Sequence, residues 1–248
     1  MQGIFRRLAS TGLAGMAIVS SALLAAPAWA LSEQQILEKL GQIPVFLIVN
    51  PEGQSLTASV NIDEETELEV PIVFVDSQEA ESFLAEAENE GEALADDAQI
   101  AILPLSDVYA EASEQLESAE SLVYVPSARS LSQATQIVDQ EIQGVPLYAA
   151  VDLESNQYLL TSDNTLPMFF SLNDLQSQVS LLIEANTGVA ESIGVEVTTF
   201  ETILQSMSAE DTEADQLLEL IRFVPSSQTL EYLRNLSGEA APAESGEQ

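Results

Sequence analysis

Four short apolar segments of this 248-residue chain occur twice, in the same order along the sequence. Each second copy follows its first by 95 to 102 positions, as expected if loops have gained or lost a few residues. One such match is expected by chance, but four in order indicate an internal duplication. The matched segments are 43–50 with 145–152, 70–74 with 166–170, 100–102 with 195–197, and 124–127 with 223–226.

Each half shows the same alternation of apolar runs and helical stripes. The runs predict about five short strands, and apolar residues at helical spacing predict three helices between and after them. Alternating strands and helices indicate a layered α/β or α+β fold with two pseudo-symmetric halves. The predicted strands are 45–49, 56–62, 70–75, 100–103 and 122–125 in the first half, and 147–151, 158–162, 168–171, 195–198 and 220–224 in the second.

The first thirty residues have the pattern of a secretory signal peptide. Arg6 and Arg7 supply the positive start, 13–26 is apolar, and 28–30 has the small-x-small form of a cleavage site. The apolar stretch is shorter than the ~20 residues of a transmembrane helix. We therefore expect residues 1–30 to be removed, giving an exported soluble protein of the periplasm or thylakoid lumen.

The remaining boundaries follow from the duplication. A helix is expected within 31–42, where Ser32 and Gln35 have the spacing of a capping box. The first repeat half then covers 43–140 and the second 141–236. Residues 237–248 are acidic and poor in large apolar side chains, which predicts a disordered tail.

The charge balance excludes several classes of function. Lys and Arg total 6 against 41 Asp and Glu, a formal net charge of −35, so the basic surface that nucleic acid requires is missing. The sequence holds no His and no Cys, which excludes disulfides, thiolate or imidazole metal sites and His-dependent catalysis. We therefore predict no cofactor, no metal and no catalytic residue. The acidity fits either a saline environment or solubility while apolar surface is exposed.

Paired carboxylates are the one catalytic device that this composition leaves in quantity. A hydrolase acting on envelope polysaccharide would place two of them in a cleft. The sequence has neither the Asp-Thr-Gly of aspartic proteases nor a phosphate-binding glycine motif, so we interpret the acidic residues as surface charge.

The best candidates for a binding surface are Met168, Phe169 and Phe170. Methionine and aromatic side chains are frequent at adaptable binding surfaces. Strand alternation places Met168 and Phe170 on one face and Phe169 on the other. They are predicted either to pack in the core or to line a groove for unfolded client polypeptides.

Several of these segments together resemble a known family. They are 30–46, 144–148, 167–170 and 223–228, and the likeness extends over most of 31–236. The chain resembles the twenty-two-kilodalton Tic family, an intermembrane-space component of chloroplast protein import with cyanobacterial relatives. The resemblance implies a two-winged α/β protein with apolar pockets, no catalytic residue, and a chaperone-like role toward translocating or outer-membrane proteins.

The leading hypothesis is therefore a non-enzymatic, exported, chaperone-like factor whose partners are unfolded or translocating polypeptides. It would assist protein translocation or outer-membrane protein biogenesis, without nucleic acid and without an integral membrane segment after processing. A carboxylate-based hydrolase and a passive envelope scaffold stay open as alternatives.

Overall fold

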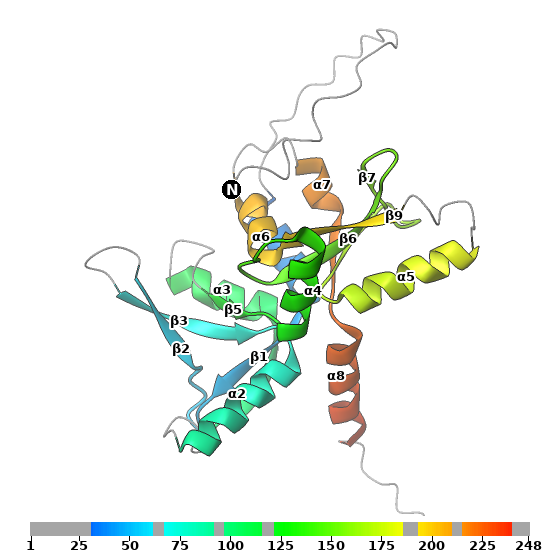
Figure 1. Ribbon diagram of the computed structural model, residues 1–248. Helices are drawn as coiled ribbons and strands as arrows, with labels where there is room; N and C mark the ends of the chain where they lie inside the picture. The colour runs from blue at the N-terminus through cyan, green and yellow to red at the C-terminus, as the bar shows by residue number, and fades with distance from the viewer. Residues whose placement is uncertain are drawn as a thin grey trace, which may run out of the picture.

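The computed structural model describes residues 31–61, 67–91, 97–115, 122–185, 193–209 and 215–239, which form two five-stranded sheets with helices around them (Figure 1). The signal peptide predicted for 1–30 lies outside these residues. The elements are α1 (Glu33–Leu40), β1 (Pro44–Val49), β2 (Thr57–Asn61), β3 (Glu67–Phe74), α2 (Ser77–Glu90), β4 (Gln99–Pro104), α3 (Leu105–Gln115), β5 (Val123–Val125), α4 (Ala128–Val138), β6 (Pro146–Asp152), β7 (Gln157–Tyr158), β8 (Leu166–Phe169), α5 (Leu172–Ala185), β9 (Ile193–Thr199), α6 (Phe200–Ser208), α7 (Asp215–Leu220), β10 (Ile221–Val224) and α8 (Ser227–Glu239).

The two sheets have the same strand connections, which confirms the predicted duplication. In the first sheet, β1 pairs antiparallel with β3 and β4, and β5 pairs parallel with β3. In the second sheet, β6 pairs antiparallel with β8 and β9, and β10 pairs parallel with β8. The sheets differ in their hairpin strand, because β2 pairs with β3 whereas β7 pairs with β6.

Strand register fixes which residues of the two halves are equivalent. Phe46 lies opposite Phe74, and Tyr148 lies opposite Phe169, so the offset is 102 for β1 and β6 but 95 for β3 and β8. The sequence match at 70–74 is therefore one residue out of register, since Pro167 is equivalent to Ile72. The error arises because the sequence match pairs Pro71 with Pro167, although the two prolines occupy neighbouring and not equivalent positions of β3 and β8.

Hydrogen bonds repeat at the same offsets. The amide of Leu105 donates to the carbonyl of Ile43 at 2.8 Å, and the amide of Phe200 donates to that of Val145 at 2.8 Å. These bonds begin α3 and α6 beside the first strand of each half. Equivalent segments of the two halves therefore begin α3 and α6 with the same hydrogen bond.

Three elements differ from the sequence prediction. The strand expected at 158–162 ends at Tyr158, because a tight turn follows in which the amide of Thr161 donates to the carbonyl of Thr165 at 2.9 Å. Helix α7 was not predicted, since its six residues are too few to show a helical stripe. Helix α8 continues to Glu239, so 237–239 of the predicted tail are helical.

The amino-terminal helix forms as predicted. The side chain of Ser32 accepts a hydrogen bond from the amide of Gln35, and the Gln35 side chain accepts one from the amide of Ser32. This capping box satisfies two amides that the first turn of a helix leaves unpaired. Ile36 and Leu40 then face the core and are buried.

The last helix of each half covers the sheet of the other half. Ala134 of α4 packs in one cluster with Tyr148 and Phe169 of the second sheet. Tyr232 of α8 packs against Phe46 of the first sheet, with ring centroids 5.7 Å apart. The outer face of the first sheet therefore carries α2 and α8, and that of the second carries α5 and α4.

Between the sheets lies a central core to which both halves contribute. Helices α3 and α6 present the same four positions to it, and all eight side chains are buried. Rings from the two halves meet there, since Tyr124 of the first half and Phe200 of the second have centroids 5.2 Å apart. Phe200 also packs against Phe223 of its own half, with centroids 5.3 Å apart. The equivalent positions are Leu105 with Phe200, Val108 with Ile203, Tyr109 with Leu204, and Ala112 with Met207.

None of the helices in the described ranges has the length and apolar character that crossing a membrane requires.

Candidate functional site

The three residues predicted to bind clients lie in the interior. Met168, Phe169 and Phe170 are 2%, 5% and 8% exposed. Met168 and Phe170 belong to the central core and Phe169 to the cluster under α4, so the predicted alternation of faces is confirmed. Client binding by these side chains stays a prediction, and it would require the packing around them to open.

The first apolar surface consists of exposed apolar side chains on α2 and α8, the helices that cover the outer face of the first sheet. Phe83 of α2 and Leu230 and Leu236 of α8 are exposed. Partly buried apolar side chains from the strands and from the residue before β2 pack against the buried cluster of the same sheet. These are Leu56, Ile72, Ile100, Ile102 and Val125.

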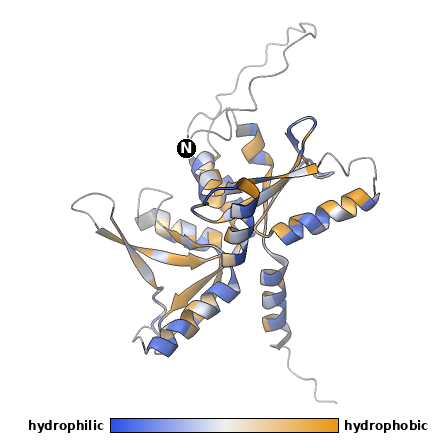
Figure 2. Cartoon of the chain, viewed as in Figure 1, coloured by the Kyte–Doolittle hydropathy of each residue, from blue (hydrophilic) through white to orange (hydrophobic). Residues whose placement is uncertain are grey.

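The second apolar surface consists of exposed apolar side chains on α4 and α5, the helices that cover the outer face of the second sheet. Leu181 and Leu182 of α5 are 59% and 46% exposed, and Ile137 of α4 is also exposed. Figure 2 shows the hydrophobic colouring along α5 and the neighbouring strands. Partly buried apolar side chains that pack against the buried cluster of this sheet include Leu159, Val179, Ile193, Val195 and Val224.

The two outer surfaces differ at equivalent positions of α2 and α5. At the offset of 95, Leu181 corresponds to Glu86, which is exposed, and Leu182 corresponds to Ala87, which is buried. The duplicated fold therefore does not require leucines at these places on α5. An exposed apolar pair that packing does not explain is a candidate contact for another molecule.

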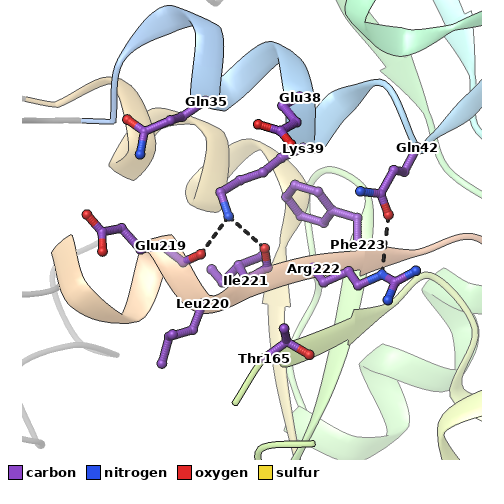
Figure 3. Close-up of a pocket in the computed structure, with 10 residues that line it drawn as sticks. All are labelled: Gln35, Glu38, Lys39, Gln42, Thr165, Glu219, Leu220, Ile221, Arg222 and Phe223. Atoms are coloured by element: carbon purple, nitrogen blue, oxygen red, sulfur yellow. Dashed lines mark hydrogen bonds between the residues drawn. The ribbon is translucent and has the colours of Figure 1, made fainter. Parts of the chain in front are cut away.

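A polar pocket of about 310 Å³ lies between α1 and the junction of α7 with β10 (Figure 3). Its cationic groups are Lys39 and Arg222, two of the four Lys and Arg residues that follow position 30. The ammonium of Lys39 donates to the carbonyls of Glu219 and Ile221, both at 2.8 Å. The remaining lining residues are Gln35, Glu38, Gln42, Thr165, Leu220 and Phe223.

Lys39, the only lysine in the sequence, lies partly buried where α1 contacts the second half of the chain. Burial lowers the pKa of Lys39, while the nearby carboxylates of Glu219 and Glu38 oppose that shift. The two carbonyls that it binds belong to the end of α7 and the start of β10, where helix carbonyls lack partners. Lys39 therefore ties α1 to the second half of the chain.

The described carboxylates do not assemble a recognisable catalytic pair. Glu38 and Glu219 share the pocket but are exposed, whereas a glycosidase acid is kept protonated by an apolar setting. Burial raises the pKa of Glu201, but both its oxygens accept from the amide of Val145, at 3.1 and 3.0 Å. Within the described ranges no three acidic residues converge to hold a metal ion.

The model of the Tic22-like family matches residues 5–234, which is most of the chain. The chain belongs to the Tic22-like family. Among the curated proteins none matches.

Two solved Tic22 structures resemble this Tic22-like chain. Anabaena Tic22, described as a protein-transport protein, has a TM-score of 0.65 at 22% identity, covering 83% of this chain and 97% of its own. Tic22 from Plasmodium falciparum has a TM-score of 0.59 at 25% identity, covering 83% and 99%. These values show a common fold over nearly the whole length of both relatives and confirm the family resemblance seen in the sequence.

Proposed function

We propose that this Tic22-like protein is a non-enzymatic, exported, chaperone-like factor that assists protein translocation or outer-membrane protein biogenesis. It would hold unfolded or translocating polypeptides in the periplasm or thylakoid lumen. The protein-transport role stated for the Anabaena relative supports the class of process. The family membership supports its transfer to this chain.

The observation that carries the proposal is the pair of outer apolar surfaces. On each sheet two helices leave apolar side chains exposed beside partly buried strand residues. Contact area of this kind suits segments that are apolar and extended, and it needs no reacting group. The leucines of α5, which replace Glu86 and Ala87 of α2, make the second surface the stronger candidate.

The acidic surface supports the same role. A net charge of −35 keeps molecules apart even when apolar surface is exposed. It also disfavours binding to anionic lipid, which would otherwise compete for exposed leucines. A complex with an unfolded polypeptide would inherit this charge and stay dispersed.

The test is suppression of aggregation of a urea-unfolded outer-membrane protein after dilution, followed by light scattering at physiological salt. The variant is Leu181→Gln/Leu182→Gln, which removes the exposed pair of α5. Its control is Ser177→Gln/Ser180→Gln, which changes two exposed serines of the same helix. We expect the wild type and the control to suppress scattering and the leucine variant to suppress it less.

Equal scattering with and without the wild-type protein would contradict the proposal. Equal activity of the leucine variant and its control would remove the second surface as the site. Turnover of an envelope polysaccharide that is lost on replacing one carboxylate would instead establish the hydrolase.

A further inference from the structure

The hairpin of the first sheet is longer than the duplicated fold requires. β3 has eight residues where its counterpart β8 has four, and β2 has five where the hairpin strand β7 has two. Figure 1 shows β2 and β3 projecting from the first sheet, away from the second half. The packing that the two halves share does not explain this added length.

β2 forms an open edge of the first sheet. It pairs with β3 and with no other strand of the described chain. The amide of Ile72 donates to the carbonyl of Leu56 at 3.0 Å, and successive residues of a strand direct their main-chain groups to opposite sides. Thr57 and Ser59 therefore direct their amide and carbonyl groups away from β3. Both residues are exposed, so these groups are accessible to another chain.

The other edge strands of the described chain are protected against added partners. β5 and β7 have only three and two residues. β4 contains Pro104, β9 contains Glu196 and β10 contains Arg222. Short length, proline and charge are the usual means by which an edge strand avoids pairing with a further chain. β2 has five residues, none of them charged and none of them proline.

The two faces of this hairpin differ in chemistry. Thr57 and Ser59 lie on the face of Glu69, whose two carboxylate oxygens accept from their hydroxyls at 2.6 Å each. The hydrogen bonds from Ser59 and Thr57 lower the pKa of Glu69, so this exposed carboxylate is ionised. Ala58 and Val60 lie on the opposite, apolar face and are only partly buried. A strand added at β2 would therefore meet one apolar face and one polar face with a negative charge.

We propose that the open edge of β2 binds an extended segment of a client polypeptide as an added strand. The client main chain pairs with the amides and carbonyls of Thr57 and Ser59. Its apolar side chains lie beside Ala58 and Val60, and a Lys or Arg on the polar face pairs with Glu69. The inference rests on the proposed function only in naming a client polypeptide as the ligand.

Glu69 is within reach of such a basic residue. Neighbouring strands lie about 4.8 Å apart, so the added strand would lie about 10 Å from β3. The hydroxyls of Thr57 and Ser59 hold the carboxylate of Glu69 toward β2, which shortens the remaining distance. The long side chain of Lys or Arg spans it.

Charge favours a client polypeptide over a second copy of this chain on the same edge. Two copies, each with a net charge of −35, repel one another. Pairing through β2 would also bring two Glu69 carboxylates toward one joint. A client segment with a basic residue meets the opposite situation. Strands of outer-membrane proteins alternate apolar and polar residues, which matches the two faces of the hairpin.

The test is binding of a fluorescent peptide that alternates Val and Thr, with one Thr replaced by Lys, measured by anisotropy with the full chain at physiological salt. Two further peptides carry N-methyl groups either on the valine amides or on the other amides. Alternate amides of a strand point to opposite sides, so only one of these peptides loses the amides that face β2. Side-chain contact with the outer apolar surfaces would not distinguish them. A fourth peptide has Gln in place of Lys.

Three variants of the chain complete the experiment. Ser59→Pro removes an amide that points away from β3, whereas its control, Ser59→Ala, keeps that amide and removes only the hydroxyl. Glu69→Gln removes the charge on the polar face. Thermal melting of each variant verifies folding, and the methylated peptides test the pairing on the wild-type chain independently of Ser59→Pro.

We expect one methylated peptide to bind about tenfold or more weakly than the unmethylated peptide, since its pairing hydrogen bonds are lost, and the other to bind with similar affinity. Ser59→Pro should weaken binding to a similar extent, and Ser59→Ala should not. The Lys peptide should bind more tightly than the Gln peptide to the wild type, but not to Glu69→Gln.

Equal affinity of the two methylated peptides, or no binding of the unmethylated peptide, would overturn the proposal. A wild-type chain that sediments as a dimer, with Ser59→Pro a monomer, would overturn it in favour of a second copy at this edge. Aggregation suppression by the leucines of α5 can succeed or fail independently of these results.

Discussion

The carboxylate of Asp174 on α5 holds the first turn of α8, accepting hydrogen bonds from the amide of Ser227 at 2.8 Å and from its hydroxyl at 2.7 Å. Glu79 of α2 holds α4 in the equivalent way, accepting from the amide of Ala128 at 2.8 Å. Both acids stand at a helix amino terminus, where negative charge is favourable. Equivalent contacts therefore fix the first turns of α4 and α8, the two helices that each cover the sheet of the other half.

Replacing Asp174 by Ala should lower the free energy of unfolding by about 1 kcal/mol, since a cap of the first turn is lost. Chemical denaturation measures this change. The control is Asp163→Ala, an exposed acid in the turn before β8. Equal stability of the two variants would mean that the contact with Ser227 contributes nothing.

Two buried tyrosines should differ in their response to loss of the hydroxyl. The hydroxyl of Tyr148 donates to the carbonyl of Ser130 at 2.6 Å and joins α4 to the second sheet. Tyr148→Phe removes this buried hydrogen bond and should cost about 1–3 kcal/mol. The Tyr124 hydroxyl is buried with no hydrogen-bond partner among the described residues, so Tyr124→Phe should not destabilise the fold. If both substitutions destabilised the protein by a similar amount, the hydrogen bond between Tyr148 and Ser130 would not be the cause of the Tyr148 effect.

Gly144 should be less replaceable than Gly53, although both have positive φ, at 103° and 82°. A Cβ at Gly53 meets nothing, whereas a Cβ at Gly144 would collide with the carboxylate of Glu201. Gly53→Ala should therefore cost about 1 kcal/mol from the backbone alone, and Gly144→Ala should cost more. In a double-mutant cycle, Gly144→Ala should be less harmful in the background of Glu201→Ala; additivity would contradict the collision.

Much of the fold was predictable because it depends on local pattern. The apolar run of β1 and the stripe Leu105, Val108, Tyr109 and Ala112 of α3 indicate which faces are buried without reference to the rest of the chain. The alternation of Met168 and Phe169 was predictable for the same reason. Such local patterns determine where helices and strands lie and which of their faces are buried.

The packing of α4 and α8 on the opposite sheets and the pocket beside α1 were not predictable. Both depend on contacts between residues that lie far apart in the sequence. The stripe of α4 shows that one side is apolar, but it does not say which sheet that side covers. Lys39 donates a hydrogen bond to the carbonyl of Glu219, which is 180 positions away in the sequence, and no local pattern near either residue predicts this contact. The exposed leucines of α5 become notable only when the register identifies Glu86 as the counterpart of Leu181.

Mild acidification should stabilise the protein. Burial raises the pKa of Asp76, Glu196 and Glu201 above their ordinary values. Between the ordinary and the raised pKa the folded state binds more protons than the unfolded state, so stability falls as pH rises through that window. Less self-repulsion at lower pH acts in the same direction.

Thermal melting between about pH 4.5 and 7.5 measures this dependence, around the ordinary carboxyl range. Glu201→Gln should flatten the curve and raise the melting temperature most at the upper end, while Gln still offers an acceptor to Val145. A wild-type melting temperature that rises with pH across this range would contradict the assignment.

The most direct test of the account is photo-crosslinking of an unfolded outer-membrane protein to the chain, with a photoreactive phenylalanine at position 181 or at position 163. Both positions are exposed in the second half, but only position 181 belongs to the second outer surface. We predict strong crosslinks to the client from position 181 and few from position 163. Equal yields at the two positions, or none at 181, would contradict client binding through the outer face of the sheet.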